Sequence, residues 1–198
     1  MSAAGAKAGD DGRLRCPWAL SAPDYVGYHD DEWGRPVTSD AAMFERLTLE
    51  GFQSGLSWLI ILRKRPGFRA AFADFDVATV ASYDEDDVDR LLADAGIVRN
   101  RAKIEATIAN ARAAADLDGG LLAHVQGYAP ATPQPAPRTL DDVRGQSPES
   151  VALAKDLRRR GFRFVGPTTL YALMQATGMV DDHLADCWCR GSASISVP

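Results

Sequence analysis

Two cysteine–histidine pairs at opposite ends of the chain constrain its fold more than any other feature of the sequence. The first pair is Cys16 and His29, and the second is His183 and Cys187. Two thiolates and two imidazoles are the ligands of a closed structural zinc site. His183 and Cys187 are four residues apart, so one helical turn would direct both at one point. If this Cys/His set binds one ion, the metal joins the beginning of a domain to its end.

An ordinary buried set is the alternative, because buried cysteines and histidines are common in proteins without a metal. Cys189 is a third thiol, and on a helix it would face away from Cys187, which lies two residues before it. Both explanations remain open from the residues alone. Three cysteines are too few for a disulfide framework. We therefore expect a reducing cytoplasm, where such sets bind metal more often than they oxidise.

The composition is that of a globular chain, with 46% hydrophobic and 25% charged residues. Its 198 residues fit one domain or two packed lobes. No apolar run reaches the length of a membrane span, so we expect no membrane partner. Residues 1–14 lack the apolar stretch of a signal peptide and predict a disordered leader, and residues 191–198 predict a flexible tail. The net charge of −5 argues only weakly against nucleic acid, because binding depends on the local field.

Helical signals extend along the whole chain, and we find no convincing run of alternating strand residues. Ser39 and Asp40 can cap a first helix. An apolar stripe predicts a second helix over residues 49–62, which Pro66 would end. Later capping residues, glycines and prolines predict helices from Asp84 to Gly96, from Asn100 to Leu117, from Ser147 to Gly161 and from Pro167 to Gly178. The predicted fold class is all-α, with many short helices.

One pair of these helices has the pattern of a DNA-binding hairpin. Residues 91–108 form a predicted helix, a tight turn at Gly96 and a second helix, with Arg99, Arg101 and Lys103 at the start of the second helix. Cations there oppose the helix dipole, whereas backbone N–H groups there suit a phosphate. Such a hairpin can bind a DNA backbone without reading its sequence. Solvated helix ends are the alternative explanation for this basic cluster.

An acidic residue among aromatic side chains predicts a ligand pocket. Glu50 lies in an apolar stretch, and Ser54 and Trp58 follow it at helical spacing. Other aromatic residues lie near the first Cys–His pair: Trp18, Tyr25, Tyr28 and Trp33. Aromatic walls and one carboxylate would bind a planar, cationic purine by stacking and by charge. An interfacial glutamate paired with an arginine is the alternative.

Six sequence blocks between about Arg15 and about Arg190 occur in an order that is typical of one family. They are RCPWA, YHDDEWGRP, LEGFQSGLSW, DAGIVRNRAKI, RRGFRFVGPTTLYALMQATGMVDDH and DCWC. Together they resemble the bacterial 3-methyladenine DNA glycosylase I family of the helix-hairpin-helix glycosylase superfamily. The resemblance implies one all-α glycosylase domain over residues 15–190, with two lobes and a hairpin at about 84–116.

The resemblance also implies roles for the candidate site residues. Its structural Zn²⁺, one per chain, would have four ligands: Cys16, His29, His183 and Cys187. Glu50 would be the catalytic residue, and four aromatic residues would bind the base: Tyr28, Trp58, Tyr25 and Trp18. Contacts to the DNA backbone would come from the hairpin: Gly96, Arg99, Arg101 and Lys103. The implied activity is the hydrolysis of the N-glycosidic bond of a flipped-out 3-methyladenine in alkylated double-stranded DNA, by a cytoplasmic monomer.

Two other classes of function compete with this hypothesis. A zinc-stapled, non-enzymatic DNA-binding module would not need Glu50 inside an aromatic pocket. A metal-dependent hydrolase would need an open coordination position, which four protein ligands do not leave. No lysine in the pocket blocks is placed to form a Schiff base, so we expect base removal without strand cleavage. The sequence therefore predicts a monofunctional DNA repair glycosylase.

Overall fold

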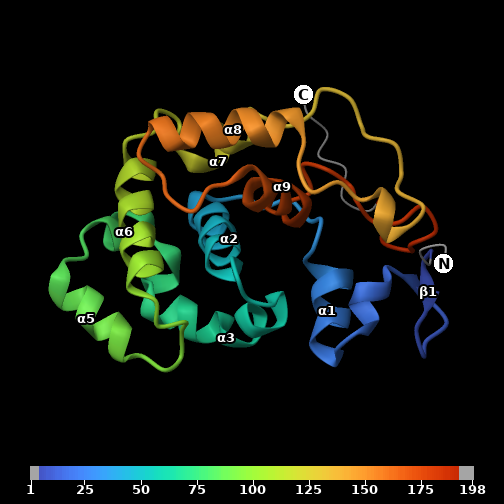
Figure 1. The fold of residues 1–198 in the computed structure, drawn as a ribbon, viewed down its shortest axis with the longest axis horizontal. Coiled ribbons are helices and arrows are strands. Elements are labelled where there is room, and N and C mark those ends of the chain that lie inside the picture. The colour runs from blue at the N-terminus through green and yellow to red at the C-terminus, as the bar shows by residue number, and fades with distance from the viewer. Residues whose placement is uncertain (1–4, 192–198) are drawn as a thin grey trace.

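The computed structural model describes residues 5–191 (Figure 1). These residues form nine α-helices, three 3₁₀ helices (η) and one pair of two-residue strands, so the predicted all-α class is confirmed. No helix in this part of the chain is long and apolar enough to cross a membrane. The elements are β1 (Lys7–Ala8), β2 (Leu14–Arg15), η1 (Pro17–Leu20), α1 (Pro23–Asp31), α2 (Asp40–Gln53), α3 (Trp58–Ala71), η2 (Ala73–Phe75), α4 (Val77–Ala81), α5 (Glu85–Ala93), α6 (Arg101–Ala115), α7 (Gly120–Gln126), η3 (Leu140–Asp142), α8 (Pro148–Arg159) and α9 (Pro167–Ala176).

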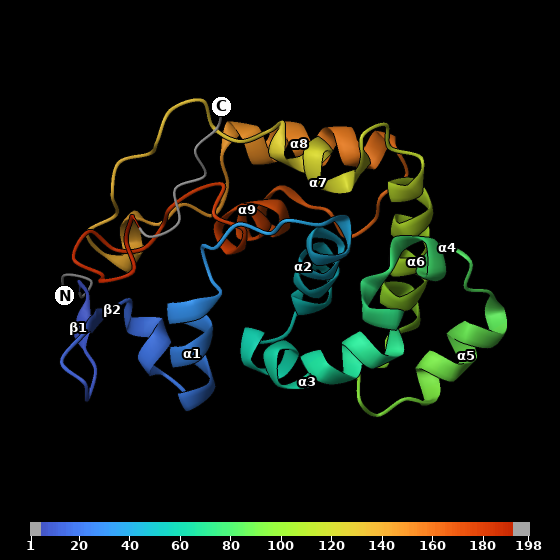
Figure 2. The same ribbon diagram turned by 180° about the vertical axis from the view of Figure 1, so that it is seen from behind.

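Helix α2 lies in the middle of the molecule, in contact with α3, α6, α7 and α9 (Figures 1 and 2). Its core face is held by a chain of buried phenylalanine rings from α2, α3 and η2. Successive ring centroids are 4.7 to 6.3 Å apart along the series Phe52, Phe68, Phe72, Phe75 and Phe44. Aromatic contacts at these separations contribute beyond the area they bury. The position of α2 is therefore fixed by the main core.

A second, smaller buried cluster joins the two ends of the described chain. Its apolar members are Cys16, Leu184, Cys187 and Cys189. Both figures show the N-terminal segment with β1, η1 and α1 beside the segment that follows α9. The fold therefore closes residues near 16 onto residues near 187.

Residues 5–14 differ from the disordered leader that the sequence predicts for residues 1–14. Strands β1 and β2 pair antiparallel, with Lys7 opposite Arg15 and Ala8 opposite Leu14. The backbone N–H of Trp188 donates to the carbonyl oxygen of Leu14 at 2.9 Å, which ties this hairpin to the C-terminal segment. Residues 1–4, and residues 192–198 of the predicted flexible tail, lie outside the described residues.

The predicted helix over residues 49–62 is wrong. Helix α2 ends at Gln53 and α3 begins at Trp58. Between them Gly55 has φ +81°, a left-handed conformation that does not continue an α-helix and that glycine adopts readily. Pro66 lies inside α3 and does not end it. The apolar periodicity continued across the break because both helices bury a face against the same core.

The predicted hairpin is present as α5 and α6. Asp84 caps α5 and Asn100 caps α6, each through a side-chain oxygen that accepts backbone N–H groups. Helices α8 and α9 form a second pair of consecutive helices packed together. The α5–α6 pair and the α8–α9 pair both follow α2 in sequence.

Lys103 of α6 holds the turn after α2. Its Nζ donates to the carbonyl oxygens of Phe52 at 2.8 Å and Ser54 at 2.6 Å, and the side chain is buried. The last carbonyls of a helix have no intrahelical donor, so this ammonium group supplies one. Burial lowers the pKa of Lys103.

We expect Lys103→Met to lower the free energy of unfolding by about 1–3 kcal/mol, because it leaves the carbonyl oxygen of the buried Phe52 without its donor. Urea unfolding followed by circular dichroism measures the change. Lys64→Met is the matched control, since Lys64 makes a similar bond to the carbonyl of Ala95 that is open to solvent. Equal effects of the two substitutions would contradict a special role for Lys103.

Candidate functional site

The four residues of the Cys/His set converge on one buried point. One ligand atom from each lies within 4.8 Å of the others. Sγ of Cys187 is 3.5 Å from Nε2 of His29 and 3.6 Å from Nδ1 of His183, and Sγ of Cys16 is 3.9 Å from Nδ1 of His183. Tetrahedral coordination with metal–sulfur and metal–nitrogen bonds of about 2.3 and 2.0 Å requires sulfur–nitrogen separations of about 3.5 Å. The set therefore fits one tetrahedral metal ion.

The surrounding side chains orient the His29 ring for this geometry. Nδ1 of His29 hydrogen bonds to Oδ1 of Asp30 at 2.8 Å, which leaves Nε2 for the metal. Arg15 is buried and donates to both Asp30 oxygens, at 2.7 to 3.1 Å, and to Asp11 at 2.7 Å. Carboxylate–histidine pairs of this kind fix ring orientation and ligand basicity in metal sites. Asp11, which the sequence places in a leader, and Arg15 thus support the set.

A turn, and not the predicted helical turn, brings His183 and Cys187 to the other two residues of the Cys/His set. His183 and Cys187 lie in a segment of bends and turns, in which the N–H of Cys187 donates to the carbonyl of Leu184 at 2.8 Å. The N–H of Leu184 points to Sγ of Cys16 at 3.4 Å. Because the segment is not a helix, the expectation that Cys189 faces away is also wrong.

Cys189 is buried on the other side of the His29 ring. Its Sγ lies 3.8 Å from Nδ1 of His29 and 3.8 Å from Oδ1 of Asp30. It therefore lies next to the carboxylate that orients His29, while Cys187 faces Nε2. A hydrogen bond from Cys16 lowers the pKa of the Cys187 thiol, and the contacts of Cys187 with His183 and His29 add to this effect. The same hydrogen bond raises the pKa of Cys16, because two thiolates this close would repel each other.

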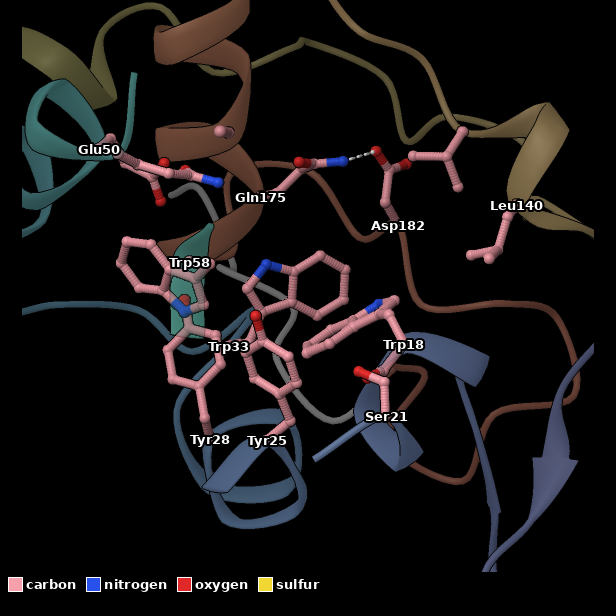
Figure 3. A pocket seen from close by; sticks show the side chains of 13 residues that line it. Trp18, Ser21, Tyr25, Tyr28, Trp33, Glu50, Trp58, Leu140, Gln175 and Asp182 are labelled. Atoms are coloured by element: carbon pink, nitrogen blue, oxygen red, sulfur yellow. Dashed lines mark hydrogen bonds between the residues drawn. The ribbon is translucent and has the colours of Figure 1, made fainter. Parts of the chain in front are cut away.

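A cavity of about 500 Å³ lies beside the Cys/His set, because Trp18 and Trp33, which line it, contact His29 and His183. Figure 3 shows the side chains that line the cavity. It brings together all five residues that the sequence assigns to the base: Glu50, Tyr28, Trp58, Tyr25 and Trp18. Its size lies in the range of small-molecule sites, and its lining combines five aromatic residues with five polar ones. The cavity suits a flat aromatic ligand with one or two polar edges.

The aromatic wall of the cavity rests on the histidines of the Cys/His set. The Trp33 ring meets the His183 ring edge-on with centroids 4.6 Å apart. The Trp18 ring contacts both His29 and Trp33, with centroids 5.1 Å from each. Aromatic edge-to-face contacts favour one arrangement of the rings. The position of the wall therefore depends on the position of the two imidazoles.

Glu50 comes from the buried face of α2. It is 6% exposed, and it receives no hydrogen bond from the residues that the structure describes. Burial raises the pKa of Glu50 to about 8, and the positive charge of Arg46 opposes this rise. The helical spacing of Glu50, Ser54 and Trp58 does not explain their proximity, because Trp58 is the first residue of α3. The turn at 54–57 instead brings Trp58 to the cavity.

Several lining residues were missed by the sequence reasoning. They are Ser21, Gln53, Leu140, Val143, Ala172, Gln175 and Asp182. Trp33, which the sequence placed among the aromatic residues near His29 without a role in binding the base, also lines the cavity. Asp182 is buried and accepts a hydrogen bond from Gln175 Nε2 at 2.8 Å (Figure 3). It also accepts one from Tyr171 Oη at 2.8 Å. Gln175 could have been recognised from the sequence, because a polar glutamine within the largely apolar α9 indicates a functional contact. Nothing local in the sequence indicated that residues 140–143 reach the cavity, because they belong to a connecting segment.

The four residues predicted to contact DNA have different positions. Arg99 is exposed and makes no hydrogen bond or ion pair within residues 5–191. Arg101 pairs with Glu85 at 2.6 Å and Asp89 at 2.8 Å. The N–H of Gly96 donates to Asp94 at 2.6 Å, so the turn amide is already used. Lys103 is buried against the end of α2, which disagrees with the predicted DNA contact.

Comparison with known proteins gives consistent relatives. The family model "Methyladenine glycosylase" matches residues 18–190. The chain is 44% identical over 179 residues to DNA-3-methyladenine glycosylase 1 of Escherichia coli (strain K12), covering 88% of this chain and 96% of the relative. A crystal structure of 3-methyladenine DNA glycosylase I superposes with a TM-score of 0.85 at 44% identity, covering 89% of this chain and 99% of that one.

A second structure shows a variant of 3-methyladenine DNA glycosylase I in complex with 3-methyladenine. It superposes with a TM-score of 0.85 at 32% identity and covers 91% of this chain and 99% of that one. The family match extends over the cavity residues and over His29, His183 and Cys187. This chain belongs to the methyladenine glycosylase family.

Proposed function

We propose that this protein hydrolyses the N-glycosidic bond of 3-methyladenine in alkylated double-stranded DNA and acts as a monomer. The observation that carries the proposal is Glu50, a buried carboxyl group inside an aromatic cavity. The family and the relative solved with 3-methyladenine support the same substrate. A non-enzymatic DNA-binding module would not need this cavity, and four protein ligands argue against a hydrolytic metal.

Methylation at N3 makes the adenine cationic and weakens its bond to the sugar. The C1′–N9 bond breaks, its electron pair stays on the base, and water adds at C1′ and loses a proton. Because the base leaves as a neutral molecule, the reaction needs less acid catalysis than removal of an unmodified base. The main tasks of the protein are to extrude the base, at a cost of roughly a few kcal/mol, and to recognise it.

Tyr28 and Trp58 form two adjoining walls. Their ring centroids are 5.4 Å apart and their planes are tilted by 45°. A base stacked between two rings would need them about 7 Å apart, twice a van der Waals contact. The two rings would therefore meet the base as a corner and not from opposite faces, with Trp18 on another side of the cavity (Figure 3).

Glu50 would act as a carboxylate that accepts hydrogen bonds from the exocyclic amine side of the base. A carboxylate also attracts the positive charge of the methylated purine. No lysine is among the described residues that line the cavity, which supports base removal without a lyase step. The protein would thus release the base and leave an abasic site.

Glu50→Gln should reduce release of 3-methyladenine roughly 10- to 100-fold, because it removes a charged hydrogen-bond acceptor. Release is measured from methylated duplex by chromatography. In the wild type the rate should rise with pH through about 8, where Glu50 becomes a carboxylate, and this rise should be missing in Glu50→Gln. Glu45→Gln, on the same helix, is the control and should keep full activity. Wild-type release by Glu50→Gln would remove Glu50 from the mechanism.

The metal that we propose for the Cys/His set is zinc, with a structural role. Two thiolates and two imidazoles in tetrahedral arrangement are the ligands that zinc prefers. When bound, it would supply a rigid connection between the chain ends, since the four protein ligands leave no position for substrate.

The purified protein should contain one zinc per chain, measured by atomic emission. His183→Ala should release the zinc and lower the thermal midpoint by roughly 5 °C or more. His124→Ala is the matched control, because His124 pairs with Asp156 far from the set in sequence and should leave the zinc bound. Full metal content in His183→Ala would contradict the proposed ligand set.

DNA contacts are proposed for Arg99 and for the turn between α8 and α9. In that turn Arg163 is exposed and its backbone is fixed by two hydrogen bonds with Asn110, at 2.7 and 3.0 Å. The exposed Phe164 lies beside Gly51, next to Glu50 on α2. Basic side chains near the cavity would bind phosphates on either side of an extruded base.

Removing one side chain that binds a phosphate should reduce the salt dependence of DNA binding by about 0.9 in the slope of log K against log salt. We expect this reduction for Arg99→Gln, measured by fluorescence anisotropy with an abasic duplex. Arg101→Gln should leave the slope unchanged, because Arg101 is already paired with two acidic residues. Equal reductions in both variants would show that Arg101 leaves its partners to bind DNA.

A further inference from the structure

Arg46 lies one helical turn before Glu50 on α2, and each side chain has a polar group without a partner. Nη1 of Arg46 is buried and has no hydrogen-bond partner among residues 5–191. The carboxyl group of Glu50 receives no hydrogen bond from the same residues. Side chains four residues apart share a helix face. A buried, partnerless guanidinium N–H is costly, so its position calls for a functional explanation.

The remaining contacts of Arg46 hold it behind the cavity wall. Its Nη2 donates to Oε2 of Glu32 at 3.1 Å. Glu32 also binds Arg65, with Arg65 Nη2 2.7 Å from Oε1. The guanidinium carbon of Arg46 lies 6.0 Å from the centre of the Tyr28 ring. The single carboxylate of Glu32 thus pairs with two guanidinium groups, those of Arg46 and Arg65. These three side chains together carry a net positive charge behind the Tyr28 ring.

Several charged or titratable groups surround Glu50 from the packed elements. Arg46 on α2 acts on Glu50 directly, and Tyr28 on α1 and Asp182 after α9 line the same cavity. Glu32 just after α1 and Arg65 on α3 lie behind Tyr28, whose hydroxyl they act on together with Glu50 and Arg46. Of these, Arg46 supplies the charge that opposes the effect of burial on the pKa of Glu50. The balance between burial and this one arginine therefore sets the charge of Glu50 near neutral pH.

We propose that Arg46 is a positioning residue for Glu50: its guanidinium group, with Nη1 buried and without a partner among residues 5–191, favours the ionised form of the neighbouring carboxyl group and orients it in the cavity. This inference rests on the proposed base-release function and adds a residue that never touches the base. The free N–H of Arg46 pairs with Glu50, directly or through one water, when the cationic base is bound.

Arg46→Met keeps the length and the helix propensity of the side chain and removes its charge. The rise of the base-release rate with pH should move upward by about one unit, so that release at pH 7 falls about tenfold while release at high pH is close to wild type. Arg46→Lys retains the charge and should keep the wild-type profile. Arg69→Met removes an arginine paired with Glu45 on the surface and should change nothing.

A purely structural role would lower the rate by the same factor at every pH, and that result would overturn the proposal. The double variant Arg46→Met, Glu50→Gln should release base at the rate of Glu50→Gln alone, since Arg46 acts through Glu50; a further loss would also overturn it.

The titration of Glu50 provides a readout that does not need activity. The ¹³C carboxyl shift of labelled glutamate should report a higher midpoint in Arg46→Met than in the wild type. If the wild type releases no base yet this midpoint moves, the proposed function fails and the Arg46–Glu50 coupling stands. An unmoved midpoint in an active protein overturns the coupling alone.

Discussion

The convergence of Cys16 and His29 with His183 and Cys187 is the constraint on which the rest of the site depends. The His29 and His183 rings support Trp18 and Trp33, and these two indoles are one wall of the cavity. The other walls come from α1 and from the central helices. A cavity assembled from distant segments needs a connection that fixes their relative position. The buried Cys/His set supplies that connection.

Helix α2 contributes the second half of the site, and it does so from the main core. Its phenylalanines anchor the helix, while Glu50 on the same helix faces the cavity. Burying a carboxyl group without a hydrogen bond costs stability, and the packed core around α2 offsets that cost and fixes the position of the group. Arg46 lies on this helix as well, so the acid and the charge that acts on it keep a constant separation.

Much of this arrangement could be predicted from the sequence, because caps, apolar periodicity and ligand chemistry are local signals. The all-α class, the caps at Asp84 and Asn100, and the residues of the Cys/His set follow from such signals. The errors arose where tertiary contacts decide the outcome. Gly55 breaks an otherwise continuous apolar pattern, Lys103 turns inward to meet the carbonyls of α2, and the leader pairs with residues near 188. Leu140 and Asp182 reach the cavity only through the fold.

The long separation within the Cys/His set has a consequence for the order of folding. Cys16 and His183 are 167 residues apart, so their contact closes one of the largest loops in the chain. Closing large loops is slow relative to forming helices and local hairpins. During synthesis, α2 and its phenylalanine core can form while the aromatic wall still lacks its support. A chain that lacks its C-terminal segment therefore contains Glu50 but not the complete cavity around it. The cavity that would bind a base is completed only when the Cys/His set comes together.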